Sequence, residues 1–207
     1  LFVYEASGNP LLLESARHGT AQGRWDMLLA ANGESLALHA DGVVRDAAGA
    51  EVKGDFLSAL DAQWRELRLP REEPRWPFRG GWALFLAYEL AAQVEPVLSL
   101  PPAPGTLPVA LALRCPAAVL RDHATGECVL VAEEGCDAML DRVTGDIDAS
   151  RALPPLPAWQ PPRECVEDAP TTFTDGVSRI LEYLAAGDVF QSNLSRGWRA
   201  GFDAALD

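Results

Sequence analysis

Two side-chain amides lie close together near the C-terminal end of the sequence, at Gln191 and Asn193. Residues 188–196 alternate with the two-residue period of a strand, and this pattern predicts both amides on one face. Amides donate and accept hydrogen bonds, so such a pair either lines a binding site or satisfies backbone groups beside a sheet. The residue types alone leave both alternatives open.

The other residues with acid–base chemistry form no recognisable site. Lys53 is the one lysine of the sequence, and it falls in an expected polar turn between a hairpin and a helix. The three histidines, His18, His39 and His123, are scattered over expected loops and strand faces and are predicted to be surface residues. There is no nucleophile elbow, phosphate-binding loop or dinucleotide-binding fingerprint. We therefore expect no catalytic residue in this chain.

The cysteines and the N-terminus bear on the cellular compartment. None of the cysteines has CxxC spacing or a histidine at a ligand interval, which argues against a zinc site. They are expected to be reduced core thiols: Cys115, Cys128, Cys136 and Cys165. No signal-peptide pattern follows Leu1, and the missing initiator Met suggests a trimmed N-terminus. The expected location is the cytoplasm.

The charge balance excludes two classes of partner. The sequence has 17 basic and 30 acidic residues and a formal net charge of −13. This charge argues against nucleic acid and against an anionic membrane surface. The longest apolar run, residues 82–88, is too short to span a bilayer. A small anionic substrate remains possible, because a local site can override the net charge.

The positioning elements follow from hydrophobic periodicity and turn residues. The first third of the sequence predicts an antiparallel meander with tight turns at Asn32-Gly33 and Asp41-Gly42. A helix capped by Asp55 is expected next. The expected strands are 11–14, which we expect to be buried, 25–31, 35–40, 43–46, 82–87, 109–113, 117–122 and 128–133, and the expected helices are 55–67 and 135–143. The fold class is therefore α+β, with antiparallel, sandwich-like sheets flanked by helices.

A proline-rich segment at residues 151–163 predicts a linker between two domains. Residues 1–150 would form the first domain, and residues 164–207 would begin a second, incomplete one. The second domain would open with a helix capped by Thr172 or Thr174 and ended by Gly187. The strand that carries the two amides would follow at residues 188–196.

Two stretches resemble one known family. AAGDVFQSNLSR, residues 185–196, closely resembles the AGD-(Y/F)-Q-x-N-L-(S/A) segment of the chorismate-utilising enzymes, with Ser192 in place of an apolar residue. That family includes anthranilate synthase component I, isochorismate synthases and aminodeoxychorismate (para-aminobenzoate) synthase component I. Residues 77–96 are similar to the family's F-x-GG-x-x-(G)-x-x-x-Y-(E/D) block, with Ala87 for a glycine and with Tyr88 and Glu89 expected to be structural. The Asn-Leu and Tyr-Glu-Leu continuations lean to the aminodeoxychorismate branch.

A third stretch resembles the tryptophan-binding motif of the same family. The motif is LLLES, residues 11–15, and the family's pocket adds a segment that begins seven residues later. The resemblance implies tryptophan-binding roles for Ser15, Gln22, Gly23, Arg24 and Trp25. A hydroxyl and loop N–H groups can hold an ammonium and a carboxylate, and strand edges can enclose an indole. Alternatively, Ser15 is an ordinary strand-end hydroxyl and Trp25 an ordinary core aromatic, which could even fill the pocket.

The resemblance also implies a reaction. The family uses a lysine, an acidic glutamate, a histidine and two glutamate ligands for Mg²⁺, all expected beyond residue 207. The chain would then be the N-terminal portion of an enzyme that joins chorismate and ammonia, the ammonia coming from glutamine through an amidotransferase subunit. The product would be 4-amino-4-deoxychorismate, on the way to p-aminobenzoate and folate. The alternatives are the anthranilate branch and a non-catalytic tryptophan-binding module.

Overall fold

The computed structural model describes residues 10–15, 17, 19–68, 75–102, 105–154 and 160–202. The chain divides into two compact units, Leu1–Leu153 and Pro154–Asp207. The fold is α+β, with antiparallel sheets and helices, as the sequence predicts. His18 lies outside the described residues.

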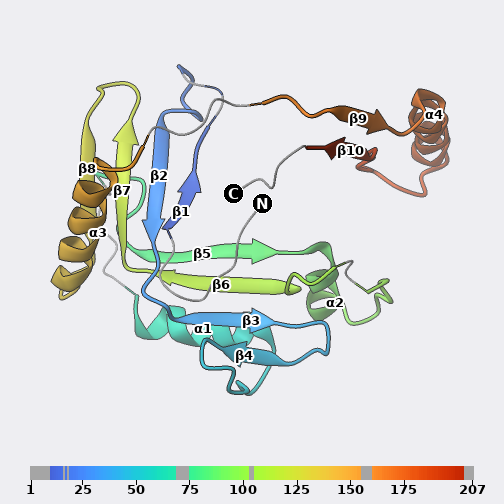
Figure 1. Ribbon diagram of the computed structural model, residues 1–207. Helices are drawn as coiled ribbons and strands as arrows, with labels where there is room; N and C mark the ends of the chain where they lie inside the picture. The colour runs from blue at the N-terminus through green and yellow to red at the C-terminus, as the bar shows by residue number, and fades with distance from the viewer. Residues whose placement is uncertain are drawn as a thin grey trace. The chain divides into compact units, whose positions relative to one another are not determined.

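Two four-stranded antiparallel sheets form the first unit (Figure 1). Sheet I has the order β1-β2-β7-β8, with bounds Pro10–Leu13, Trp25–Ala30, Ala117–Asp122 and Cys128–Ala132. Sheet II has the order β4-β3-β6-β5, with bounds Val44–Asp46, Ser35–Leu38, Ala110–Cys115 and Gly81–Leu86. In Figure 1 the strands of sheet I run across those of sheet II.

Both faces of sheet I pack against apolar clusters, as strand β7 illustrates. Ala118 and Leu120 face a buried cluster that also includes Leu29 of β2 and Cys115 of β6. Since side chains alternate along a strand, Ala117 and Val119 face the opposite side, where they join a second cluster. A strand covered on both faces reads as a nearly continuous apolar run, as β7 does.

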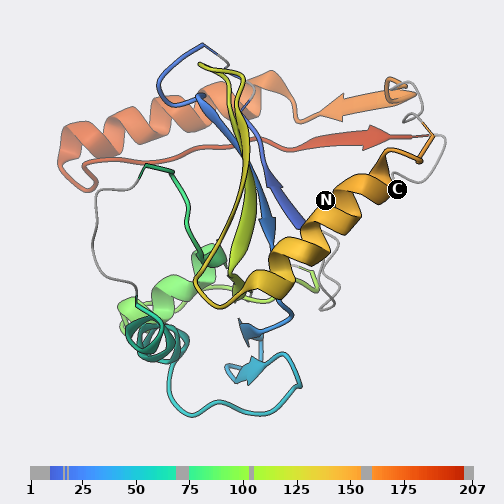
Figure 2. The same cartoon turned by 90° about the vertical axis from the view of Figure 1, so that its left-hand side faces the viewer.

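Helix α3, Asp137–Ser150, packs against that second face of sheet I (Figure 2). Met139 and Val143 of the helix contact the cluster around Ala30 and Ala117. The prediction ended this helix at residue 143, which is wrong, because the helix continues for two more turns through Gly145. A glycine inside a helix costs only about 1 kcal/mol, so Gly145 does not end it.

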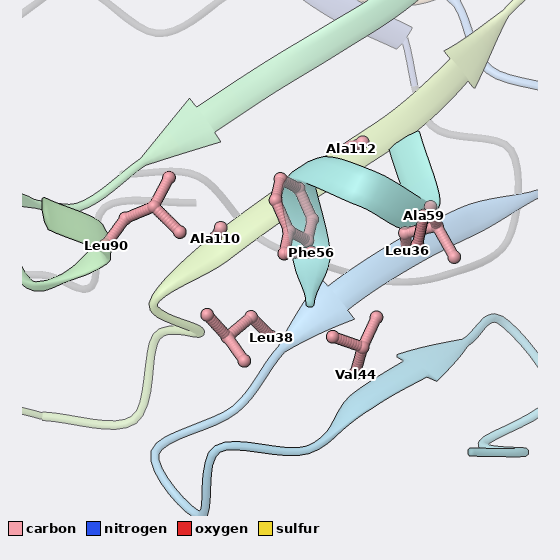
Figure 3. Close-up of a cluster of buried hydrophobic side chains, with 8 residues drawn as sticks. All are labelled: Leu36, Leu38, Val44, Phe56, Ala59, Leu90, Ala110 and Ala112. Atoms are coloured by element: carbon pink, nitrogen blue, oxygen red, sulfur yellow. The ribbon is translucent and has the colours of Figure 1, made fainter. Parts of the chain in front are cut away.

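Helix α1, Phe56–Glu66, packs against sheet II, and its predicted cap is confirmed. Asp55 accepts a hydrogen bond from the backbone N–H of Ser58 at 2.8 Å. Figure 3 shows Phe56 among small and branched side chains of the sheet, where its ring is fully buried. The cluster consists of Leu36, Leu38, Val44, Phe56, Ala59, Leu90, Ala110 and Ala112.

The short segment after β5 contributes Leu90 to this cluster. It comprises the 3-10 helix η1, Tyr88–Leu90, and the helix α2, Ala91–Val94. The structural role expected for Tyr88 has little basis in packing, because its side chain is 81% exposed. Leu90, at 6% exposed, is the residue that anchors this segment.

One predicted hairpin is wrong, and another is confirmed. Strand β2 pairs with β1 and β7 instead of β3, so Asn32-Gly33 marks the passage of the chain from sheet I to sheet II. The backbone N–H of Asn32 donates to the backbone carbonyl of Arg114, beside the place where β6 passes into β7. Asp41-Gly42 does join paired strands, β3 and β4. A turn signal fixes a reversal locally but does not choose the partner strand.

The second unit is small. It contains β9, Glu164–Glu167, the helix α4, Pro170–Ala186, and β10, Trp198–Gly201, which pairs with β9. Helix α4 begins at Pro170, so Thr172 and Thr174 lie inside it and do not cap it. Gly187 ends the helix in the left-handed conformation, φ +81°, as predicted. The strand predicted at residues 188–196 is wrong, because those residues form no strand.

Candidate functional site

The candidate site lies where the chain turns from β1 into β2. These strands are antiparallel neighbours, with Leu13 opposite Met27 at the end of β1, two residues before Ser15. The side-by-side arrangement expected from the seven-residue spacing is therefore present. Strand β1 is an edge strand and is not buried as expected, since Leu13 is 44% exposed.

The loop between the strands is held by its own hydrogen bonds. The Gly23 N–H donates to the carbonyl and the hydroxyl of Thr20, both at 3.1 Å. The Thr20 hydroxyl donates to the Arg17 carbonyl at 3.1 Å, and the Arg17 N–H donates to Ser15 Oγ at 3.3 Å. A hydroxyl that accepts one hydrogen bond can still donate its proton to another group.

Gly23 approaches the opposite side of this loop closely. A Cβ at Gly23 would lie 3.0 Å from Ser15 Oγ and would overlap the Arg17 carbonyl. The geometry thus brings together Ser15 and Gly23, two of the residues assigned to one pocket. Gln22 is exposed in the same loop.

Arg24 is engaged by a buried carboxylate from a distant strand. Its Nε and Nη2 donate to Asp122 Oδ1 and Oδ2 at 2.9 and 2.6 Å, a two-point ion pair. The Arg24 side chain is 47% exposed, whereas that of Asp122 is 3% exposed. Hydrogen bonding from Arg24 lowers the pKa of Asp122 from 3.8 to about 2. Asp122 is therefore an anion at every physiological pH.

Trp25 is partly buried and packs against the apolar cluster between the two sheets. Its ring meets that of Trp76 edge-on, with centroids 6.0 Å apart. The Arg24 guanidinium lies over the Trp25 ring, 5.0 Å from the centroid. Leu13 and Trp25 occupy neighbouring positions on the same side of sheet I, so an apolar wall lies beside the Ser15–Gly23 loop.

A second polar pair lies nearby, and sequence reasoning missed it. His123 Nε2 lies 2.7 Å from Asp26 Oδ2, and both side chains are mostly buried. The backbone N–H of His123 also donates to the backbone carbonyl of Arg24 at 2.8 Å. The prediction of an ordinary surface histidine is wrong for His123. The adjacent Asp122-His123 sequence was the available signal, but nothing local connects it with residues 24–26.

Other predicted site residues lie elsewhere. Gln191 and Asn193 belong to the second unit, where both are exposed and lie outside any strand. Lys53 is exposed in a polar turn. Of the four cysteines only Cys115 is buried, so the prediction of core thiols is wrong for Cys128 and Cys165, which are exposed.

The described part of the chain offers neither a metal-binding cluster nor a membrane-spanning helix. Within it, no group of three or more His, Cys, Asp or Glu side chains could hold a metal ion. None of the helices in that part is long and apolar enough to cross a membrane.

Comparison with known proteins identifies the family. The family model described as "chorismate binding enzyme" matches residues 9–206. The chain therefore belongs to the chorismate-binding enzyme family.

Two curated relatives carry the name "Anthranilate synthase component 1". The protein of Streptomyces coelicolor is 34% identical over 139 residues, 58% of this chain and 27% of that protein. The protein of Cereibacter sphaeroides is 26% identical over 229 residues, 98% of this chain and 45% of that protein. The chain thus spans less than half the length of these relatives.

A solved structure agrees with the fold. It is anthranilate synthase component I from Streptococcus pneumoniae TIGR4, with a TM-score of 0.58 and 16% identity. The match covers 84% of this chain and 41% of that one. At this identity the likeness concerns the fold alone.

Proposed function

We propose that this chain is the N-terminal portion of aminodeoxychorismate synthase component I. The whole enzyme would convert chorismate and glutamine-derived ammonia to 4-amino-4-deoxychorismate, with a glutamine amidotransferase subunit as its partner. The observation that carries this proposal is the family match over residues 9–206. The choice of branch rests on the Tyr88-Glu89-Leu90 and Asn193-Leu194 continuations noted in the sequence.

Anthranilate synthase component I is the second candidate. The names of the two curated relatives favour it. Both reactions use chorismate and ammonia, but their products differ in the position of the amino group, in aromaticity and in the enolpyruvyl group. Anthranilate lacks the enolpyruvyl group of chorismate, so its formation must release pyruvate, whereas 4-amino-4-deoxychorismate retains that group.

This difference gives the test. The full-length protein would be incubated with chorismate, ammonium and Mg²⁺, and products would be followed by mass spectrometry together with a pyruvate assay. The proposal expects 4-amino-4-deoxychorismate without pyruvate. Anthranilate with equimolar pyruvate would assign the other branch. The 207-residue chain alone serves as the control and is expected to form neither product.

The resemblance implies Mg²⁺ for the whole enzyme. Among the described residues no acidic cluster fits a metal ion, so that part of the chain offers no place for Mg²⁺. What this chain contributes under the proposal is its first unit and the amino-acid pocket within it.

The pocket is the second part of the proposal. Ser15 and the loop of Gln22, Gly23 and Arg24, with Trp25 in the adjoining wall, would hold L-tryptophan. The support is the contact between Ser15 and Gly23 and the apolar wall beside them. Titration calorimetry with L-tryptophan on the full-length protein tests it. If no L-tryptophan binding is detected up to millimolar concentration, the pocket is rejected while the family assignment stays intact.

A further inference from the structure

The pair between Arg24 and Asp122 has a consequence for what the pocket can bind. Arg24 directly follows Gly23, and its guanidinium lies 5.0 Å from the centroid of the Trp25 ring. It is therefore beside the place where the proposed pocket would receive an aromatic ligand. Both oxygens of Asp122 accept from this guanidinium. The buried anion thus takes two of the five N–H donors of the guanidinium and balances its charge, which weakens the attraction of Arg24 for a ligand carboxylate.

We propose that Asp122 is a specificity-determining positioning residue: it fixes the guanidinium of Arg24 and balances its charge, so that the pocket takes a zwitterionic aromatic amino acid rather than an aromatic carboxylate anion. This inference rests on the pocket proposed above. With the charge of Arg24 balanced by Asp122, the neutral groups that this loop offers a ligand include the Ser15 hydroxyl and the side-chain amide of Gln22. Such neutral donors and acceptors suit a ligand that carries its own balanced charges.

The position of Asp122 in the fold supports a role beyond the pair itself. It ends β7, where it lies opposite Trp25 of β2, and its side chain is almost fully buried. Asp122 Oδ1 also accepts from the Ala124 N–H at 2.9 Å. Asparagine at this position keeps an amide oxygen for that bond and removes the charge. Asp122→Asn thus weakens the hold on Arg24 while it keeps the hydrogen bond to the Ala124 N–H.

Three related probes report the preference of the pocket. L-Tryptophan carries an ammonium and a carboxylate, indole-3-propionate carries the carboxylate alone, and tryptamine carries the ammonium alone. Their affinities would be measured by calorimetry on the full-length protein and on Asp122→Asn. We expect the wild-type protein to prefer L-tryptophan. In Asp122→Asn, the released Arg24 should improve indole-3-propionate relative to tryptamine by about tenfold, the effect of one charge-assisted hydrogen bond.

Two further variants separate specificity from structure. The double variant Asp122→Asn with Arg24→Gln has neither charge, and it should show the wild-type ratio of the three affinities. Asp41→Asn is the matched control, because Asp41 also pairs with an arginine, Arg45 at 2.8 Å, but does so in the β3–β4 hairpin. It should leave the ratio unchanged. Arg17, in the same loop as Arg24, is present in every variant and cannot cause a difference.

The outcomes are distinct. If the wild-type protein binds L-tryptophan and Asp122→Asn weakens all three probes in proportion, the inference is wrong and the pocket stands. If the double variant loses indole-3-propionate selectively, then Arg24 already contacts the carboxylate in the wild-type protein, and the inference is again wrong. The double variant also provides the test if Asp122→Asn alone does not fold. If the wild-type protein binds no probe, the pocket and the inference fall together.

Discussion

The carbonyl group of Arg17 occupies the space that a side chain on Gly23 would need. No positive φ is involved at Gly23, so the requirement for glycine there is one of space alone. The loop that joins β1 to β2 can close only because residue 23 has no Cβ. This contact fixes the position of Ser15 relative to the start of β2, and the first prediction follows from it.

Gly23→Ala is expected to displace the loop and to weaken L-tryptophan binding at least tenfold, because the new methyl group overlaps the Arg17 backbone. Calorimetry measures the affinity, and urea unfolding measures stability. Gly145→Ala is the control, since nothing lies within 4 Å of a Cβ there and the residue is inside α3. It should raise stability by about 0.5–1 kcal/mol without changing affinity. Unaltered affinity in Gly23→Ala would show that the loop is not part of the pocket.

Ser15→Ala tests the hydroxyl. A hydrogen bond to a charged ligand group is worth about 1.5–3 kcal/mol, so L-tryptophan should bind about tenfold more weakly or worse. The control is Ser58→Ala, whose hydroxyl donates to Asp55 at the start of α1. That change should slightly lower stability and leave affinity as it is. Equal affinities for the Ser15 variant and the wild-type protein would remove Ser15 from the site.

The low pKa of Asp122 predicts a pH-dependent stability. Its pKa is about 2 when folded, against an ordinary value of 3.8, so the folded state favours the ionised carboxyl. The resulting stabilisation is complete above about pH 5 and is lost as the pH falls from about 4 to 2. The difference in unfolding free energy between the wild-type protein and Asp122→Asn should therefore shrink over that interval. A difference that stays constant down to pH 2 would contradict this.

Phe56 is the largest fully buried side chain in the described part of the chain. Phe56→Ala should lower the free energy of unfolding by about 3–5 kcal/mol, because it leaves a cavity between α1 and sheet II. Leu57→Ala, one residue along the same helix at 36% exposed, should cost about 1 kcal/mol or less. Denaturant unfolding of both variants measures the two values. Similar losses would mean that α1 does not pack through the face described.

A buried ion pair gives the last prediction. Arg114 and Glu133 form a two-point pair with side chains 6% and 12% exposed, and Arg114 also donates to the Gly81 carbonyl at 2.9 Å. Glu133→Gln should cost about 3–5 kcal/mol, since it leaves a buried guanidinium without its anion. The double variant Arg114→Met with Glu133→Leu should recover most of that loss in unfolding experiments. Failure to recover would indicate that the pair is needed for packing.

The exposed pair of Arg65 and Asp61, one turn apart on α1, is the matched control for that experiment. Both side chains are largely in water, where such pairs contribute little. Asp61→Asn should therefore change stability by no more than about 0.5 kcal/mol. A loss as large as that of Glu133→Gln would show that burial is not the cause.

The features that sequence patterns predicted well are those set by near neighbours. Asp55 caps α1 because its carboxylate reaches an N–H three residues away. Gly187 ends α4 because the helix end depends only on the backbone conformation of this one residue. Strand β7 was located correctly because both of its faces are apolar. Asn32-Gly33 misled the prediction because the next strand joins another sheet. Residues 188–196 show that a two-residue alternation does not make a strand when no partner strand pairs with it.

The candidate site divides in the same way. The contact between Ser15 and Gly23 follows from a short spacing and could be expected from the sequence. Asp122 and His123 could not, because the pairing of β2 with β7 brings them to Arg24 and Asp26 from about half the chain away. No local signal in the sequence marks such a pairing.

That distance has a consequence for how the protein forms. Arg24 and Asp122 are 98 positions apart, so the loop can be set only after a long segment of chain has been synthesised and closed. Closing such a segment is entropically costly and makes pairings of this kind slow. A ligand held by the loop would bind the finished sheet and not the open chain. It would therefore protect the protein mainly by slowing its unfolding, as contacts absent from the folding transition state do.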